Sequence, residues 1–390
     1  MRVPIDTIQT ALANENLDGW LLYDFHGSNS IAKEIVEPQG IVTRRWFGWI
    51  PRQGEPVFIH HKIEKAPFVN MPGKKVDYLP WQRLDEVLQT TLQGARRVAM
   101  EYSPNCAIPY VAKVDAGMIE KLRAWNLEIV SSADLIAQFL APWTAEQVTM
   151  HKRAHDGIAA IRDAAFELVS KSVRDGKSLN EFQVMQFILD EFEKRGLETL
   201  DGPICAVGPN AGAPHYEPTA AASAPIGKEQ VVLLDIWAKE KKENAVYADI
   251  TWVGYTGKTV PAKVQEVFEI VARARDEAIA YANKQLEAGK IVHGFEIDDA
   301  ARRVITDAGY GEYFIHRTGH SIGTDVHGVG PNIDNLETQD QRRLQEGMCF
   351  SIEPGIYLPE FGIRLEVDVM IQDGRAVVTT LPLQTKMVML

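Results

Sequence analysis

The chain has 390 residues and a formal net charge of −12, with 45% hydrophobic and 24% charged residues. This length allows two or three domains, and the composition is that of an ordinary soluble globular protein. The negative charge argues against a nucleic-acid partner, because contacts with phosphates require a basic face. No apolar run approaches the ~20 residues that cross a bilayer, so we expect no membrane partner either.

The N-terminal segment and the cysteines indicate the compartment. The first residues, MRVPIDTIQT, lack the charged and apolar regions of a secretory signal. Cys106, Cys205 and Cys349 are odd in number, far apart and outside any CxxC pair, which is typical of free thiols in a reducing compartment. We therefore expect a cytoplasmic protein.

Residues 1–141 alternate short helical and strand patterns. Helices are expected at residues 4–14, 84–93 and 112–125, and strands at 19–23, 57–60 and 97–101. This alternation predicts an α/β domain with its own small core. Its histidines and tryptophans are interpreted as polar surface residues and half-buried residues, respectively: His26, His60, His61, Trp20, Trp46 and Trp49.

A domain boundary is predicted at Pro142, which interrupts the chain. Thr144 and Gln147 follow as a T-x-x-Q capping pattern, which indicates the start of a helix over residues 145–172. We therefore expect the second domain to occupy residues 142–390.

A second helix is expected at residues 178–195, with Ser178 and Glu181 as a capping box and Gly196 as the C-terminal cap. The segment ICAVGPNAGAPHYEP then predicts a strand and a Pro/Gly-rich loop that ends at His215 and Tyr216. A loop histidine alone is usually exposed to solvent, so this position gains meaning only from the motifs that follow.

Two apolar segments carry one aspartate each. Asp235 follows residues 231–234, and Asp249 lies within the apolar stretch 245–253. The polar KEKKEN between them predicts a hairpin tip, so the strands should pair antiparallel and bring both aspartates close. Capping of a strand end would explain Asp235 alone, but it does not explain an aspartate inside an apolar strand.

Helices at residues 261–286 and 296–308 precede the block HRTGHSIGTDVH, which runs from His316 to His327. Gly319 and Gly323 disfavour a helix here, so a loop is expected to present His320. Two glutamates follow: Glu353 in SIEPGIY and Glu366 in GIRLEVDV.

Two aspartates, one histidine and two glutamates thus follow one another along the chain, and these are residue types that bind metal ions. Four carboxylates in one pocket repel one another, so the pocket must bind protons or cations. Carboxylates with one imidazole and no thiolate favour Mn²⁺ or Co²⁺, with Zn²⁺ as an alternative. The negative charge of four carboxylates exceeds what one divalent ion balances. This predicts two ions about 3.5 to 4 Å apart.

The Asp235 strand, the YADIT around Asp249, the histidine block, IEPGIY and IRLE resemble the M24 metallopeptidase family, which includes methionine aminopeptidase, aminopeptidase P and prolidase. The motifs cover residues 146–390. The resemblance implies an α+β protein in which a pita-bread domain, a curved antiparallel sheet with outer helices, follows a smaller creatinase-like α/β domain. It also implies a homodimer in which the first domain narrows the entrance to the active site.

The resemblance further implies roles for named residues. The metal ligands would be Asp235, Asp249, His320, Glu353 and Glu366. A water between the two ions would attack the peptide carbonyl, with Glu353 moving the proton to the leaving nitrogen. His327 and His215 would stabilise the developing charge. Substrate contacts are expected from His316, Arg364 and Tyr216.

The two-domain size and the IEPGIY and GIRLE motifs resemble the proline-specific branch. We therefore expect a small peptide substrate, cleaved between its N-terminal residue and proline, with a prolidase-like dipeptidase slightly favoured. Similar prolidases carry an arginine for the substrate carboxylate where this chain has Gln339, with Arg342 and Arg343 nearby. Aminopeptidase P, which acts on longer peptides, therefore remains an alternative.

Other departures from the family pattern are Trp252 and Val253, where an Arg-Thr pair is frequent, and Gly328, where an acid is frequent. Two further function classes share this fold. A creatinase-like hydrolase works without metal, and a non-catalytic member serves as a binding protein. Both are expected to lose ligands, whereas this chain retains all five.

Overall fold

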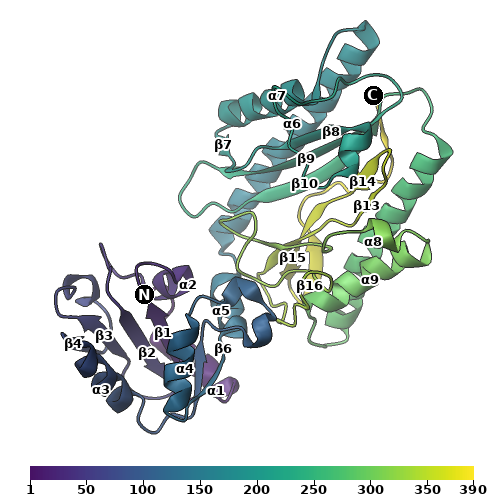
Figure 1. The fold of residues 1–390 in the computed structure, drawn as a ribbon. Helices are drawn as coiled ribbons and strands as arrows, with labels where there is room; N and C mark the ends of the chain where they lie inside the picture. Colours follow the sequence, from purple (N-terminus) through teal and green to yellow (C-terminus); the bar gives the residue numbers. More distant parts are fainter. The chain divides into compact units, whose positions relative to one another are not determined.

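The computed structural model describes residues 1–390. The chain folds into two compact units, Met1–Phe139 and Leu140–Leu390 (Figure 1). This division lies two residues before the boundary expected at residue 141. None of the helices combines the length and the apolar character needed to span a membrane.

The first unit is a six-stranded mixed sheet with the strand order β4-β3-β2-β1-β5-β6. Strand β1 pairs antiparallel with β2 and parallel with β5, so the unit has the α/β character expected. The strands are β1 (Gly19–Asp24), β2 (Trp46–Pro51), β3 (Val57–His61), β4 (Lys74–Tyr78), β5 (Arg97–Met100) and β6 (Glu128–Ser131). The helices are α1 (Ile5–Asn14), α2 (Ser30–Val36), α3 (Trp81–Thr91), α4 (Ala116–Ala124) and α5 (Ala133–Leu140).

Trp20, Trp46 and Trp49 are more deeply buried than expected. Trp20 and Trp46 are fully buried because each indole N–H has a buried carboxylate as acceptor. Trp20 donates to Glu101 at 2.6 Å, and Trp46 donates to Asp24 at 3.1 Å. His60 is also buried and stacks on a phenylalanine ring, so its interpretation as a surface residue was wrong.

The second unit contains the helices α6 (Ala145–Asp175), α7 (Glu181–Arg195), α8 (Ala262–Glu287) and α9 (Gly294–Asp307). The Thr144–Gln147 capping box is present at the start of α6, and Gly196 ends α7 in the left-handed conformation, as predicted. The cap of α7 was predicted wrongly, because its capping box is formed by Asn180 and Gln183. The side chain of Glu181 is instead turned into the protein interior.

The strands of this unit form several sheets. The longest hairpin pairs β9 with β10 antiparallel, and β17 adds a parallel edge to β10. A second sheet has the antiparallel order β11-β12-β15-β16, and β13 pairs with β14. The strands are β7 (Leu197–Glu198), β8 (Ile204–Val207), β9 (Val231–Glu240), β10 (Ala248–Tyr255), β11 (Ser321–Ile322), β12 (Cys349–Ile352), β13 (Gly355–Tyr357), β14 (Gly362–Arg364), β15 (Val367–Gln372), β16 (Arg375–Val378) and β17 (Val388–Met389).

Side-chain alternation along β9 separates two cores. Val232, Leu234 and Ile236 pack with helices α6 and α7, which cover one side of the β8–β10 strands (Figure 1). Val231 and Leu233 point the other way, into the core that includes α8 and α9. Successive side chains of a strand face opposite sides, so Asp235 faces away from α6 and α7.

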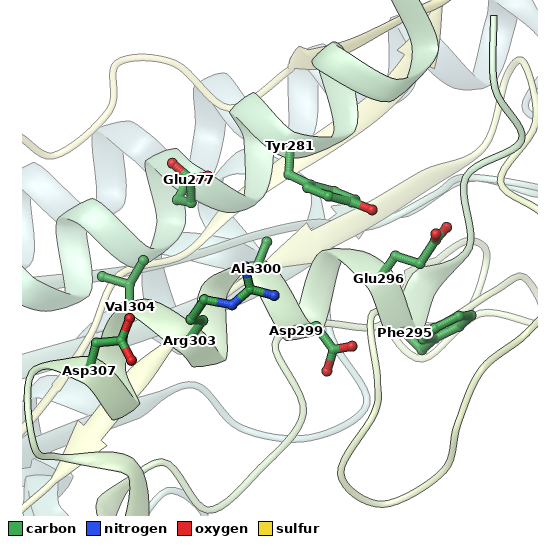
Figure 2. Close-up of a pocket in the computed structure, with 9 residues that line it drawn as sticks. All are labelled: Glu277, Tyr281, Phe295, Glu296, Asp299, Ala300, Arg303, Val304 and Asp307. Carbon is green, nitrogen blue, oxygen red and sulfur yellow. The ribbon is translucent and has the colours of Figure 1, made fainter. Parts of the chain in front are cut away.

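A pocket of about 350 Å³, open to solvent on one side, lies between helices α8 and α9. Figure 2 shows lining residues from both helices, including Glu277 and Tyr281 on α8 and Ala300 and Arg303 on α9. Its walls come from these two helices alone, and they include none of the site residues expected from the sequence. The remaining lining residues are Phe295, Glu296, Asp299, Val304 and Asp307.

Candidate functional site

The β9–β10 hairpin places its two aspartates on one face. Asp235 lies directly across from Thr251, and Asp249 stands two residues before Thr251 on the same strand. Residues two apart on a strand share a face, so all three side chains point to the same side. The hydroxyl of Thr251 lies 3.0 Å from Asp235 Oδ1 and 2.7 Å from Glu366 Oε2. Thr251 therefore connects acids from two distant parts of the chain.

Glu366 reaches this face because its backbone pairs with β10. Its N–H donates to the carbonyl of Thr251 at 3.1 Å. Glu366 directly precedes β15, which carries the rest of the motif into the antiparallel sheet. The side chain is buried together with Asp235 and Asp249. Three of the expected ligands therefore share one buried region.

His320 is presented by a loop, as expected. A Cβ atom at the preceding Gly319 would lie 1.9 Å from the carbonyl oxygen of Ser351, so only glycine permits this close approach. The N–H of His320 donates to Ser351 Oγ at 2.9 Å. The N–H of Ser351 in turn donates to the carbonyl of His320 at 2.8 Å, so the backbone is held on both sides of the imidazole.

The ring of His320 has a defined tautomer. Its Nδ1 lies 3.1 Å from the carbonyl oxygen of Ser321, which can only accept, so Nδ1 carries the proton. Burial lowers the pKa of His320 well below its ordinary value, which keeps the ring neutral. The lone pair of Nε2 therefore faces Asp249 Oδ2 at 3.8 Å and Glu353 Oε1 at 3.5 Å.

Asp249, His320 and Glu366 form a buried cluster whose potential ligand atoms all lie within 4.8 Å of one another. Burial, with the charge of Asp235 next, raises the pKa of Asp249 well above its ordinary value. Burial and the charge of Asp249 do the same for Glu366. Burial also raises the pKa of Glu353 to about 7. These carboxylates therefore repel one another when ionised.

This cluster fits a divalent cation. Asp249 Oδ1 is buried without a hydrogen-bond donor, although a buried acceptor normally has one. A cation beside this oxygen would also relieve the repulsion between the carboxylates and would accept the lone pair of His320 Nε2. Carboxylate oxygens with one imidazole nitrogen are a donor set suited to Mn²⁺, Co²⁺ or Zn²⁺.

Asp235 has a different partner. The guanidinium of Arg364 forms an ion pair with Asp235 Oδ2 and donates from Nε to Thr251 Oγ1 at 3.0 Å. Its Nε also lies 4.0 Å from Glu353 Oε2. Arg364 is buried, so its charge offsets part of the negative charge of the site in a region that solvent does not screen.

His316 stands beside this arginine. Its Nδ1 donates to the carbonyl of Arg317 at 2.6 Å, and its Nε2 accepts from the hydroxyl of Tyr357 at 2.6 Å. Arg364 donates to the same hydroxyl at 3.2 Å. Burial, followed by the charge of Arg364, lowers the pKa of His316 to about 3. His316 is therefore a neutral ring that Tyr357 holds in place.

The other expected histidines lie close by. The ring of His327 is 4.5 Å from the ring of His320, nearly perpendicular to it. Burial, followed by the charges of Arg317 and His215, lowers the pKa of His327. His215 is exposed on its loop and also contributes to the lowered pKa of His316. The structure thus brings the candidate ligands and the pocket histidines into one region.

Sequence reasoning missed four residues that support this site: Thr251, Ser351, Tyr357 and Asp368. All four stand inside quoted segments, namely Thr251 in YADIT, Ser351 and Tyr357 in SIEPGIY, and Asp368 in GIRLEVDV. Ser351 donates to Glu353 at 3.1 Å, two residues along the same strand segment. Asp368 follows Glu366 by two residues, a spacing that places both on one face of an extended chain.

The departures from the family pattern have structural explanations. Trp252 faces α6, where the Arg162 guanidinium lies 3.8 Å from its ring centre, so it does not line the site. A Cβ atom at Gly328 would lie 2.9 Å from Ser321 Oγ and 3.1 Å from Gly323 N, so a larger side chain would crowd the closed histidine loop. Arg342 is buried in an ion pair with Asp340, so its guanidinium is engaged by another side chain.

Comparisons with known proteins agree with this geometry. Residues 151–373 match the family model described as metallopeptidase family M24. An Xaa-Pro dipeptidase from Lactobacillus delbrueckii subsp. lactis is 36% identical over 326 residues, which cover 80% of this chain and 79% of that protein.

Solved structures with a similar fold include the dipeptidase PepE from Mycobacterium ulcerans and a recombinant prolidase from Thermococcus sibiricus. The first is 22% identical with a TM-score of 0.71, and the match covers 98% of this chain and 96% of that chain. The second is 25% identical with a TM-score of 0.62, covering 99% and 98%. The expected α+β pita-bread fold is thereby confirmed.

Proposed function

This chain belongs to metallopeptidase family M24 and is therefore a peptidase, and we propose that it hydrolyses the bond between an N-terminal residue and proline in Xaa-Pro dipeptides. The observation that carries the proposal is the buried cluster of Asp249, His320 and Glu366. It lies beside Glu353 in a chain that is 36% identical to an Xaa-Pro dipeptidase.

We propose two divalent ions, with Mn²⁺ favoured by the oxygen-rich donor set. Asp249 and Glu366 would serve both ions, Asp235 would complete one position, and His320 with Glu353 would complete the other. Two ions would also balance more of the negative charge than one. The guanidinium of Arg364, which pairs with Asp235, adds local positive charge.

When bound, such ions activate water as a nucleophile and polarise the scissile carbonyl. Glu353 would accept the proton of the attacking water and deliver it to the leaving nitrogen, because its carboxylate lies beside the cluster, with Oε1 3.5 Å from His320 Nε2. His327 and His215 would donate hydrogen bonds to the carbonyl oxygen as negative charge develops there. His316 would face the substrate, with its ring held by Tyr357.

A second candidate is aminopeptidase P activity on longer peptides. A strict dipeptidase needs a cation for the free substrate carboxylate, and Arg342 is engaged by Asp340 while Arg364 is engaged by Asp235. Neither guanidinium is an obvious carboxylate receptor. This observation supports retaining the alternative.

Hydrolysis by metal-stripped protein supplied with Mn²⁺ would test both candidates. An Xaa-Pro dipeptide and the same peptide extended by one residue should be compared under identical conditions. Cleavage of the dipeptide alone would support the prolidase assignment, and preference for the extended peptide would support aminopeptidase P. Cleavage of neither would refute both assignments.

Two further proposals rest on the family resemblance and the cysteines. A homodimer would be tested by light scattering coupled to size-exclusion chromatography. A cytoplasmic location is supported by the free cysteines, of which Cys205 and Cys349 are buried and Cys106 is exposed. Localisation of the tagged chain in its native cells would test it.

A further inference from the structure

A buried glutamate outside the metal cluster organises the loop that carries His215. Glu181 occupies the first position of α7, and its side chain is fully buried. Burial of a carboxylate is costly unless hydrogen bonds replace the water that it loses. The partners that satisfy Glu181 therefore indicate what this residue is for.

All the donors to Glu181 come from one segment, residues 207–224. The N–H groups of Val207 and Ala224 donate at 2.8 Å and 2.6 Å, so the carboxylate holds both ends of the segment. The side-chain amide of Asn210 lies 3.0 Å from each carboxylate oxygen, and the Tyr216 hydroxyl donates at 2.5 Å. His215 is the neighbour of Tyr216 and lies inside this set of contacts.

The backbone reinforces the same arrangement. The N–H of Glu181 donates to the carbonyl of Ala224 at 3.2 Å, and the N–H of Ile226 donates to the carbonyl of Leu179 at 2.8 Å. The returning end of the segment is therefore paired with the start of α7. A loop of this kind has few ladder contacts of its own, so the buried carboxylate supplies the fixed point that it lacks.

The segment also packs against the hairpin that bears Tyr357 and Arg364. A Cβ atom at Gly362 would lie 1.8 Å from the carbonyl oxygen of Ala211, so the two backbones are in close contact. A Cβ atom at Gly212 would likewise lie 2.4 Å from the carbonyl oxygen of Leu358, between β13 and β14, and His215 follows three residues later on the same segment. Fixing the segment therefore fixes one wall of the candidate site.

We propose that Glu181 is a positioning residue, which holds residues 207–224 so that His215 faces the scissile carbonyl. Tyr216 and Asn210 act through Glu181, and the Tyr216 hydroxyl serves this contact instead of binding substrate. The proposal rests on the proposed peptidase function for its effect on rate. Its effect on the loop is independent of the substrate.

The test is a double-mutant cycle between Glu181→Gln and His215→Ala. The glutamine keeps the size of the side chain but turns an NH₂ group toward groups that donate, which disrupts the contacts. Glu181→Gln should lower kcat/KM by about 10- to 100-fold in the wild-type background, because small displacements of a catalytic group are costly. The same substitution should have little effect when His215 is already alanine.

A purely structural role would give a different result. Glu181→Gln would then reduce kcat/KM equally in both backgrounds, and this outcome would overturn the proposal. Loss of bound Mn²⁺ from Glu181→Gln would also overturn it, because the segment holds no candidate ligand. Glu193→Gln is the matched control, since Glu193 is an exposed glutamate on the same helix and pairs with Lys241. It should leave activity unchanged.

Tyr216→Phe provides a milder variant in case Glu181→Gln does not fold. It removes one donor, and its loss of kcat/KM should also disappear in the His215→Ala background. Additive losses would assign Tyr216 a separate contact with substrate and would contradict the proposal.

Hydrogen exchange separates this proposal from the proposed function. Glu181→Gln, or Tyr216→Phe, should accelerate exchange within residues 207–224 whatever peptide the protein cleaves. Unchanged exchange in residues 207–224 would refute the positioning role of Glu181, even if the wild-type protein cleaves Xaa-Pro dipeptides. A wild-type protein that cleaves no such peptide would refute the proposed function alone, with the exchange result still deciding the role of Glu181.

Discussion

The N–H of Asp249 donates to Oδ2 of Asp368 at 2.9 Å, so a second carboxylate holds the backbone of a candidate metal ligand. Asp368 is fully buried, and its own N–H donates to Thr380 Oγ1 at 2.7 Å. Groups that contact a ligand from behind determine its orientation and tune the affinity of the site. Asp368 is therefore expected to influence metal binding without touching the metal.

Replacing Asp368 by alanine should weaken Mn²⁺ binding by about 10- to 100-fold, the usual effect of losing such a contact. The unpaired N–H of Asp249 should also destabilise the fold by about 1–3 kcal/mol. Asp368→Asn retains an acceptor oxygen and should lose less Mn²⁺ affinity and less stability than Asp368→Ala. Calorimetric titration of metal-stripped protein measures the affinity. Asp373→Asn, on the exposed turn after β15, is the control, and unchanged affinity in Asp368→Ala would contradict the role.

Thr251 offers a sharper comparison, because valine has the same shape without the hydroxyl. Thr251→Val removes the oxygen that contacts Asp235, Glu366 and the Nε of Arg364. We expect about a 10- to 100-fold loss of metal affinity and a matching loss of activity at limiting Mn²⁺. Thr251→Ser keeps the hydroxyl and should stay close to wild type. Equal behaviour of the two variants would show that the hydroxyl is irrelevant.

Much of the candidate metal site could be predicted because short stretches of the sequence indicate it. An aspartate inside an apolar strand is costly unless the structure uses it, so Asp249 stood out from its neighbours. The KEKKEN tip predicted the hairpin that pairs β9 with β10. The Thr144–Gln147 capping box was equally local, since both partners lie within one helical turn.

The residues that sequence reasoning missed depend on distant partners. Trp20 is fully buried because it donates to Glu101, which is 81 residues away. Ser178 and Glu181 matched a capping box, but tertiary contacts with residues 207–224 drew the Glu181 side chain inward and left capping to Asn180. No local pattern distinguishes these outcomes, because the alternative caps have similar intrinsic energies.

In metal-stripped protein, the carboxyls of the cluster should contribute stability that is lost as the pH rises from about 4.5 to about 7. The buried histidines His316, His320 and His327 contribute in the opposite direction, because their pKa values are lowered. Burial raises the pKa of Glu353 from 4.5 to about 7, and burial with neighbouring negative charge raises those of Asp249 and Glu366. These carboxyls therefore bind more protons in the folded state than in the unfolded state in this window. Below the pKa that these carboxyls have in the unfolded chain, their stabilising contribution is fully present. It is lost as the pH rises through their higher pKa in the folded protein.

Bound Mn²⁺ should reverse this trend, because the cation favours the ionised carboxylates. At a metal concentration of about 100 times Kd, the stabilisation should reach about 2.7 kcal/mol. Scanning calorimetry with chelator or with Mn²⁺, at about pH 5 and about pH 7, measures the difference. A Tm difference between metal-stripped wild type and metal-stripped Glu353→Gln that stays constant across this interval would refute the electrostatic account. Glu353→Gln removes one titrating group. The Tm of metal-stripped Glu353→Gln should therefore increase relative to that of the metal-stripped wild type between about pH 5 and about pH 7.

Glu353→Gln should also decrease kcat by about 10²- to 10⁴-fold, the usual contribution of a general acid–base group. Glutamine keeps the size of the side chain and can still accept the hydrogen bond that Ser351 donates at 3.1 Å. It cannot carry a proton between the attacking water and the leaving nitrogen. The loss should therefore fall on kcat and leave KM within a few fold.

Because Glu353 is also a candidate ligand, the kinetics must be measured at saturating Mn²⁺, with bound metal determined by atomic emission. Glu360→Gln is a suitable control, since Glu360 is exposed on the same stretch of chain, after β13. Full metal content together with near-normal kcat in Glu353→Gln would remove Glu353 from proton transfer. Reduced metal content that accounts for the whole loss would leave it only a ligand. A low kcat in fully loaded protein assigns Glu353 to proton transfer, as its position 3.5 Å from His320 Nε2 leads us to expect.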